Sequence, residues 1–204
     1  NEQTFSERTS DYFFAAFLRA KLFHQKGDSE ALEYAKVFAH RKNSKNELFD
    51  QAKAFAQIYE GYDESTSNRY ALCFVQKNQR FSSLCLAGYT IDDIRVCRAI
   101  YAQSYAQNMC FGDFIGDDVR SYAYAEEVLS RFLAGYSYRF CQVYAHKRIH
   151  MNMSEITSIM YALEYEAQCV KNQTEEYAEG FAIGKVLHSL PDEYSTLFAL
   201  NYTS

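Results

Sequence analysis

The sequence predicts an all-α protein, and three observations support that class. Apolar residues recur at helical spacing along nearly the whole chain, no convincing run alternates between apolar and polar residues as a strand does, and Gly, Ser, Thr and Asp stand where helix caps are needed. The chain has 204 residues, 48% hydrophobic and 23% charged, with one Pro and eight Gly. This composition excludes a disordered chain. We expect one domain over residues 1–204, a disulfide-stapled bundle of about seven to nine helices.

The N-terminal part, residues 1–66, predicts three helices and contains no cysteine. The first helix ends at Gly27, and the second begins directly after it. Ser44 with Glu47 matches a capping box that starts the third helix, and Gly61 ends it. We expect these helices to pack through apolar side chains alone.

The middle of the chain predicts two further helices and a loop. The fourth helix covers residues 67–87, and the fifth begins at Thr90, with Asp93 at its third position, and continues to about Cys110. Residues 111–118 read FGDFIGDD. Two Gly and three Asp in this run disfavour a helix, so it predicts a loop.

The C-terminal part is helical again after that loop. An interruption is predicted at Gly135, and the next helix opens at Asn152 or Ser154. Polar residues at 172–174 break the helical pattern once more. Pro191, at the first helical position, starts a short terminal helix.

A short repeat lies on this framework. The residues Leu-Ala-Gly-Tyr at 86–89 recur at 133–136, and each copy is followed by a cysteine, an aromatic residue and an alanine. We therefore expect two related helical units, residues 67–110 and 117–170.

The cysteines form an even set without a C-x-x-C pair, which favours disulfides over zinc or thioredoxin-like chemistry. The six are Cys73, Cys85, Cys97, Cys110, Cys141 and Cys169. Helix geometry excludes the bridges Cys73–Cys85 and Cys97–Cys110, because each pair lies on one predicted helix, roughly 18 and 20 Å apart along its axis. The other pairings stay open.

Three features predict a secreted, extracellular glycoprotein. The sequence begins at Asn1 without a hydrophobic leader, as expected after a signal peptide has been cleaved. The even number of cysteines suits an oxidising compartment. Acceptor sequons occur at Asn152, Asn172 and Asn201, where N-glycosylation would take place.

The charge of the chain argues against nucleic acid as a partner, and its hydropathy argues against a membrane span. The net charge is −5 and no long basic run is present, which argues against binding of nucleic acid. No window approaches 18 uninterrupted apolar residues, so no membrane span is expected.

No catalytic or cofactor-binding motif is found, so we expect a non-enzymatic protein without cofactor or metal. His146 and His150 share a helical face, but no carboxylate ligand stands near them, and we interpret them as polar surface. Asp113, Asp117 and Asp118 lack the spacing of a calcium loop and are interpreted as helix N-caps.

The aromatic content is unusual, with 18 Tyr, 16 Phe and no Trp. Tyrosines at helical spacing, such as Tyr101 with Tyr105 and Tyr161 with Tyr165, are interpreted as core residues whose hydroxyls reach the edge of the core. Two other uses stay open. The rings could enclose a small apolar ligand between helices, or they could anchor a protein partner.

Two cysteine–tyrosine–cysteine units lie within residues 70–170: Cys97, Tyr101 and Cys110, then Cys141, Tyr144 and Cys169. In this pattern the chain resembles the bicycle family of secreted aphid salivary effectors. The resemblance implies delivery with saliva into plant tissue and action by binding a host partner, not by catalysis. We therefore expect a secreted effector that binds a protein partner, with an extracellular carrier of a small apolar ligand as the alternative.

Overall fold

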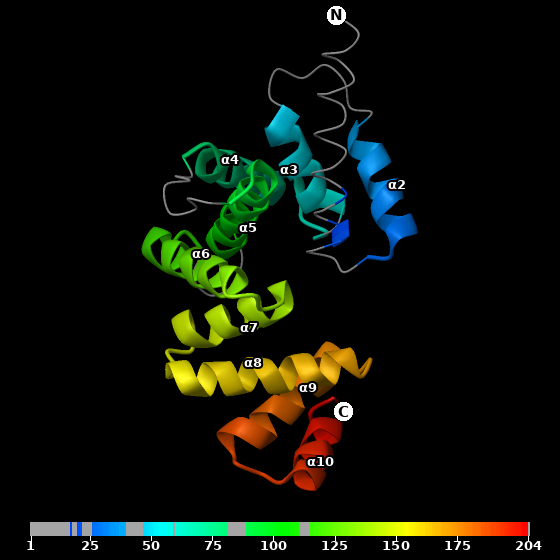
Figure 1. Ribbon diagram of the computed structural model, residues 1–204, viewed down its shortest axis with the longest axis vertical. Helices are drawn as coiled ribbons and strands as arrows, with labels where there is room; N and C mark the ends of the chain where they lie inside the picture. The colour runs from blue at the N-terminus through cyan, green and yellow to red at the C-terminus, as the bar shows by residue number, and fades with distance from the viewer. Residues whose placement is uncertain are drawn as a thin grey trace, which may run out of the picture. The chain divides into compact units, whose positions relative to one another are not determined.

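The fold is all-α, as predicted. The computed structural model describes residues 17, 20–21, 26–39, 47–58, 60–80, 89–110 and 115–203, and no strand occurs among them. Its contacts divide the chain into two compact units, residues 1–125 and 126–204 (Figure 1). None of the described helices combines the length and the apolar content that crossing a bilayer requires.

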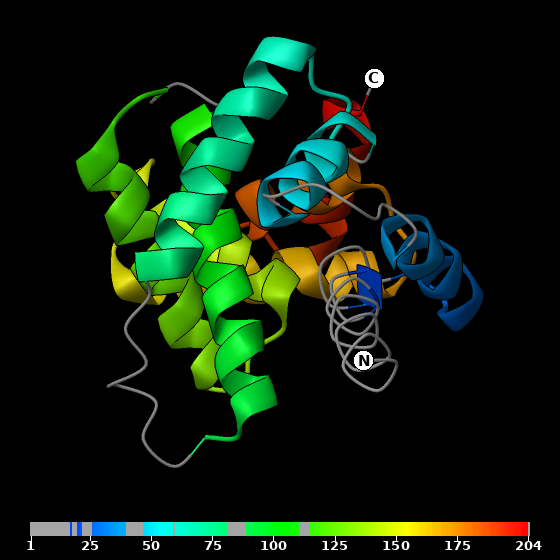
Figure 2. The same ribbon diagram turned by 90° about the horizontal axis from the view of Figure 1, so that it is seen from above.

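The first unit contains α2, α3, α4, α5 and the start of α6. Helix α4 packs against both α3 and α5, and Figure 2 shows α4 lying alongside α5. The bounds are α2 Asp28–Ala39, α3 Glu47–Ile58, α4 Glu64–Arg80, α5 Ile91–Cys110 and α6 Asp118–Leu133.

Aromatic rings and alanines fill the core of the first unit. The Tyr70 ring stacks between Phe55 and Phe74, with ring centroids 6.0 and 6.3 Å apart. Fully buried alanines such as Ala54 and Ala71 lie in the same cluster. Small residues beside large rings let the helices approach closely while the rings fill the space between them.

The second unit contains the rest of α6 and five further elements. Each of α7, α8 and α9 packs against the α-helix that follows it in the chain (Figure 1). A π-helical turn, η2, continues α9 and packs against α10. The bounds are α7 Tyr138–Ile149, α8 Glu155–Val170, α9 Glu175–Ala182, η2 Ile183–Leu187 and α10 Asp192–Tyr202.

One three-residue turn recurs between these helices. At residues 135–137, Gly135 has a φ of +91°, and Ser137 caps α7 by accepting a hydrogen bond from the Phe140 N–H (3.1 Å). The intervening Tyr136 N–H donates to the carbonyl of Arg131 (3.2 Å). This combination of a left-handed residue and a backward hydrogen bond ends one helix, and the cap starts the next.

The same sequence of left-handed residue, intervening residue and cap occurs at five places among the described residues. They are residues 61–63, 135–137, 152–154, 172–174 and 189–191. In the first of them, Gly61 has a φ of +68° and Asp63 caps α4. The Gly-Tyr pairs at 61–62 and 135–136 therefore both belong to this turn.

The observed helix boundaries agree with most of the predicted ones. The Thr90 and Asp93 capping box is confirmed, since Asp93 N–H donates to Thr90 Oγ1 and Thr90 N–H donates to Asp93 Oδ2, both at 3.1 Å. Ser154, not Asn152, caps α8. Pro191 is the cap of α10, not its first helical residue, because its ψ of 158° is extended.

Parts of the predicted N-terminal helices lie outside the described residues. Of the first predicted helix, residues 17 and 20–21 are described, and they are helical. Ser44 and residues 81–88 also lie outside the described part, so the capping box at Ser44 and the first copy of the repeat stay predictions.

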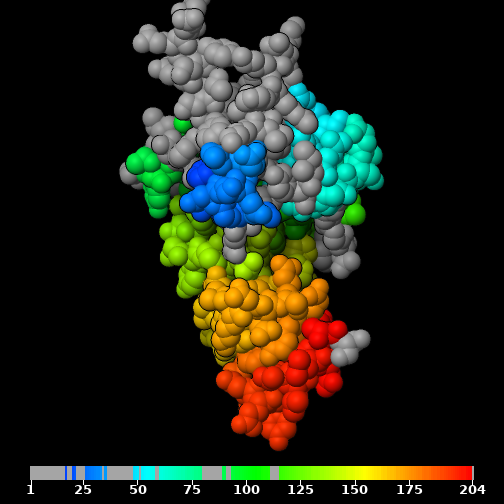
Figure 3. Space-filling model, turned by 90° about the vertical axis from the view of Figure 1, so that its right-hand side faces the viewer, coloured from blue at the N-terminus to red at the C-terminus, as the bar shows by residue number. Residues whose placement is uncertain are grey.

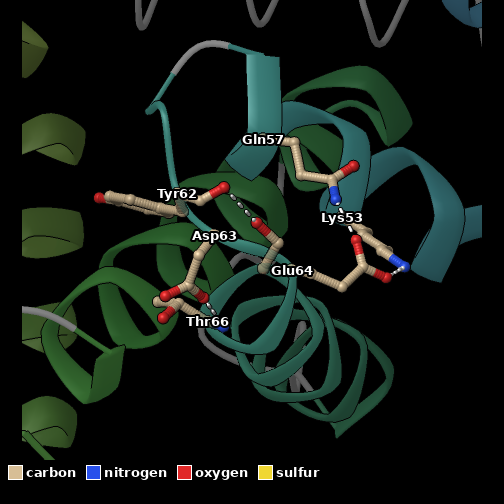
Figure 4. Close-up of polar contacts among 7 residues, drawn as sticks. Lys53, Gln57, Tyr62, Asp63, Glu64 and Thr66 are labelled. Atoms are coloured by element: carbon tan, nitrogen blue, oxygen red, sulfur yellow. Dashed lines mark hydrogen bonds and ion pairs between the residues drawn. The ribbon is translucent and has the colours of Figure 1, made fainter.

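Polar contacts fix the turn between α3 and α4 (Figure 4). Glu64 at the start of α4 accepts hydrogen bonds from Lys53 and from Gln57 of α3, the latter at 2.5 Å. Asp63 accepts from the Thr66 N–H at 2.7 Å. The hydrogen bond with Lys53 lowers the pKa of Glu64, and the one with Thr66 lowers that of Asp63.

The closest helix contact in the second unit gives a testable prediction. A Cβ on Gly180 would lie 2.9 Å from the Ala199 backbone and 2.8 Å from the Tyr202 Cβ. Gly180→Ala adds about 1 kcal/mol of helix propensity, but the clash with α10 costs about 1–3 kcal/mol. We expect a net loss in the free energy of unfolding, measured by urea denaturation.

The matched control is Gly27→Ala, because no heavy atom lies within 4 Å of a Cβ at that position. Its stability should stay within about 0.5 kcal/mol of the wild type. A Gly180→Ala protein as stable as the Gly27→Ala protein would show that α9 and α10 do not pack as described.

Candidate functional site

A buried lysine lies at the centre of a polar cluster in the first unit. The Lys77 side chain is only 7% exposed. Its ammonium lies 4.0 Å from the Tyr105 ring centre and 3.6 Å from the Tyr122 ring centre, and 3.8 Å from Asp118 Oδ1. The Tyr105 hydroxyl donates to the same carboxylate. The ring faces and the carboxylate replace the water that the buried cation has lost.

Two thiols lie next to this cluster. Cys73, one helical turn before Lys77 on α4, forms a hydrogen bond with Cys110, the last residue of α5. That bond, with Arg69 and Lys77 nearby, lowers the pKa of Cys73 to about 7 despite its partial burial. The same bond and burial raise the pKa of Cys110. Arg69 Nη2 also donates to the Cys110 carbonyl at 3.4 Å.

The second unit repeats the pairing of a cation with a tyrosine ring, and here the cation is a partly buried arginine. Arg131 lies 4.4 Å from the Tyr144 ring centre, donates to the Tyr144 hydroxyl at 2.8 Å and pairs with Glu155 at 2.5 Å.

Lys147 follows the same pattern, 4.3 Å from the Tyr161 ring centre and 3.4 Å from Glu179 Oε1. The Tyr161 hydroxyl donates to the backbone carbonyl of Glu179 at 3.4 Å. In both places a tyrosine joins two helices through its ring and its hydroxyl.

The tyrosine interpretation is confirmed for Tyr105 and Tyr161, which are 3% and 1% exposed and whose hydroxyls reach polar groups. Of the two motif tyrosines, Tyr144 is buried against Arg131. Tyr101 is half-buried on α5, and it is Tyr105, one turn further on, that covers Lys77.

The cysteines are not joined in the way expected. Cys73, Cys110, Cys141 and Cys169 are thiols, and Cys85 lies outside the described residues. The Cys141 thiol donates to the Tyr136 carbonyl at 3.8 Å instead of bonding to another sulfur. Disulfide staples are therefore not part of the described fold. Because α5 is continuous, Cys97 and Cys110 do lie on one helix, as predicted.

The three sequon residues, Asn152, Asn172 and Asn201, are all exposed. Asn152 and Asn172 have φ values of 51° and 60° and occupy the left-handed position of the recurring turn. The Ser or Thr of each of these two sequons is the cap of the following helix. Two of the three sequons thus have a structural role, and glycosylation at all three stays a prediction.

The residues considered for metal binding have other contacts. The rings of His146 and His150 stack with centroids 4.9 Å apart. Asp117 caps α6 by accepting from the Arg120 N–H at 3.0 Å, as predicted, whereas Asp118 pairs with Lys77. Asp113 lies outside the described residues. Within the described part of the chain, no group of three or more His, Cys, Asp or Glu could hold a metal ion.

An exposed apolar stripe runs along α8, and sequence reasoning missed it. It consists of five residues spaced alternately by four and three positions: Ile156, Met160, Leu163, Ala167 and Val170. The four large side chains are 72%, 50%, 49% and 74% exposed. We call these five residues the α8 stripe. In Figure 3 the surface of α8 and α9 lies beside that of α10.

The opposite face of α8 is buried, with Ser158, Tyr161, Ala162 and Gln168 against its neighbours. Helix α8 is therefore apolar on two sides, and its chain neighbours α7 and α9 cover only one of them. In the sequence the stripe is visible as apolar residues at heptad spacing. The residues of the buried face follow a similar helical spacing, so the two faces are hard to distinguish.

Comparison of the chain with protein-family models, curated proteins and solved structures found no match in any of the three.

Replacing Tyr105 tests whether its ring stabilises the buried Lys77. Tyr105→Leu removes the ring and should lower the free energy of unfolding by about 2–4 kcal/mol. Tyr105→Phe keeps the ring and loses only the hydrogen bond to Asp118, which costs about 1 kcal/mol. Equal losses in urea denaturation of the two variants would show that the ring does not stabilise the cation.

Alkaline pH gives a second test. Burial raises the pKa of Tyr62, Tyr105, Tyr161 and Tyr165 in the folded protein, whereas an unfolded chain ionises its tyrosines near pH 10. The protonated form is thus favoured by folding, so this stabilisation is present below pH 10 and is lost as the pH rises above it. We expect the free energy of unfolding in urea to fall from about pH 9 to about pH 11, with phenolate absorbance delayed relative to the unfolded chain. A constant free energy of unfolding over this pH range would contradict the raised pKa values of these buried tyrosines.

Proposed function

We propose that this protein is a secreted, non-enzymatic interaction protein that uses the α8 stripe to bind a basic amphipathic helix of a partner protein. The single observation that supports this most strongly is the exposure of apolar side chains at coiled-coil spacing on α8.

The spacing of the stripe suits a helical partner. Positions separated alternately by four and three residues form the seam along which two helices pack side chains into one another's gaps. The stripe extends over two heptads, from Ile156 to Val170. A seam of this kind, left in water, favours association because it removes large apolar side chains from the solvent.

The negative charge of the second unit favours a basic partner. Residues 126–204 contain ten Asp and Glu against six Lys and Arg, a net charge of −4, whereas residues 1–125 have 16 against 15, a net charge of −1. Helix α8 itself carries Glu155, Glu164 and Glu166 and no Lys or Arg. Glu155 already pairs with Arg131. A basic helix would complement Glu164, Glu166 and the net negative charge of this unit, and a second copy of α8 would place like charges together.

The location and the biological role of the interaction follow from sequence features. The exposed sequons and the resemblance to the bicycle family support an extracellular effector with a host protein as its partner. The alternative, a carrier of a small apolar ligand, stays a prediction. It is less favoured, because the buried rings of Tyr105, Tyr144 and Tyr161, which could have enclosed a ligand, contact cations instead.

A designed peptide tests the proposal. The probe is a fluorescent amphipathic helix with Leu along its seam and Lys at the flanking positions, and the control peptide has Glu in place of each Lys. We expect fluorescence anisotropy to give a Kd of roughly 10 μM for the Lys peptide. The affinity should fall as the salt concentration rises, and the Glu peptide should bind at least about tenfold more weakly.

Variants locate the binding surface. Leu163→Asp lies in the stripe and should weaken binding by about tenfold or more. Leu197→Asp is the matched control, since Leu197 on α10 is 56% exposed and outside the stripe, and it should leave binding unchanged. Equal effects of the two variants, or binding of the two peptides with the same affinity, would overturn the proposal. Self-association through α8 would contradict the predicted partner.

A further inference from the structure

We propose that Cys73 and Cys110 form a dithiol site for thiol–disulfide exchange, in which Cys73 attacks a small disulfide and Cys110 resolves the mixed disulfide. This inference concerns the first unit and does not depend on the proposed binding function of α8.

The positions of the two sulfurs support the proposal. Cys110 belongs to the buried core cluster of the first unit, and Cys73 packs against that cluster, where α4 contacts α5. The two thiols interact there through a side-chain hydrogen bond. Cys73 is half-buried and therefore accessible to a small reagent, whereas Cys110 is only 2% exposed. An accessible attacking thiol next to a buried resolving thiol is the arrangement found at redox-active cysteine pairs.

The charges around Cys73 favour its thiolate. Arg69 and Lys77 lie four residues before and after it on the same face of α4, and both lower its pKa together with the hydrogen bond from Cys110. Asp118 from the start of α6 opposes them. Tyr105 of α5 and Tyr62, which faces Cys110, complete the set of titratable groups around the pair. With a pKa of about 7, Cys73 is substantially ionised at neutral pH.

The exchange has two balanced steps. The Cys73 thiolate attacks one sulfur of glutathione disulfide, a bond forms between Cys73 and that sulfur, and the other glutathione leaves as a thiolate that takes up a proton. Cys110 then gives its proton to water and attacks the Cys73 sulfur, which releases the second glutathione. The second glutathione also leaves as a thiolate and takes up a proton, so the protein has lost two electrons and two protons in total, and one glutathione disulfide has become two thiols.

Loss of the thiolate charge helps the second step. The hydrogen bond with Cys73 is the largest cause of the raised pKa of Cys110, burial is the second and the charge of the Cys73 thiolate is the third. Arg69 acts in the opposite direction. Once Cys73 is in the mixed disulfide, its negative charge is gone and Arg69 still lies beside Cys110, so Cys110 ionises more easily.

Oxidation of the full-length protein tests the pair directly. The protein is reduced, freed of reductant and incubated with glutathione disulfide, and the products are mapped by peptide mass spectrometry. The wild type should form a Cys73–Cys110 disulfide without retained glutathione, and Cys110→Ser should retain one glutathione on Cys73. Cys73→Ser should form neither product at that site. A bridge from Cys73 to another cysteine, or no reaction at Cys73, would overturn the proposal.

Alkylation by iodoacetamide provides a readout that does not depend on disulfide formation. Cys169 is the internal control, because it is also half-buried but its pKa is raised by burial. At pH 7 we expect Cys73 to react about tenfold faster than Cys169, with half of its maximal rate near pH 7. Arg69→Gln should move that midpoint upward, and Arg95→Gln, an exposed arginine on α5, should not. Equal rates at Cys73 and Cys169 would contradict the assignment of Cys73 as the attacking thiol.

Discussion

The recurring turn of left-handed residue, intervening residue and cap is the constraint on which the rest of the described structure depends. Where it joins α3 to α4, α7 to α8, α8 to α9 and η2 to α10, the two joined elements pack against each other, because the short turn leaves no room for a long connection. In the second unit this gives α8 two main partners, α7 and α9. Among the described residues, the side of α8 that carries Tyr161 is buried and the side that carries Leu163 is exposed. The exposed stripe is thus a direct consequence of the short turns, and a partner helix is the natural way to cover it.

Contacts between tyrosine rings and cations recur in both units. Three cations, the buried Lys77 and Lys147 and the partly buried Arg131, each lie within 4.4 Å of a tyrosine ring centre. Each pairs with a carboxylate that is more exposed than the cation. An apolar ring such as Phe can cover a cation but cannot also hydrogen-bond to a second helix, whereas Tyr does both. This accounts for Tyr at these three places, and alanines fill much of the remaining core.

The sequence was most informative where a single residue type determines the local backbone conformation. Gly61, Gly135 and the Thr90 capping box were predicted, because positive φ values and N-caps restrict residue type strongly. Asn152 was considered as a helix start, residues 172–174 as a break and both Asn residues as glycosylation sites, but the turn that the Asn-x-Ser/Thr pattern makes at both places was not predicted. The α8 stripe and the Cys73–Cys110 contact were missed for a different reason. Helical periodicity alone does not tell which of two apolar faces is covered, and contact between α4 and α5 depends on tertiary packing.

Hydrogen exchange of the full-length protein, with and without the basic amphipathic peptide, tests the central claim most directly. If a partner helix covers the α8 stripe, amide exchange should slow in residues 155–170 on addition of the peptide, and exchange in α10, which also exposes Leu197 and Leu200, should be unchanged. Protection confined to α10 or to the first unit, with α8 unaffected, would contradict the account.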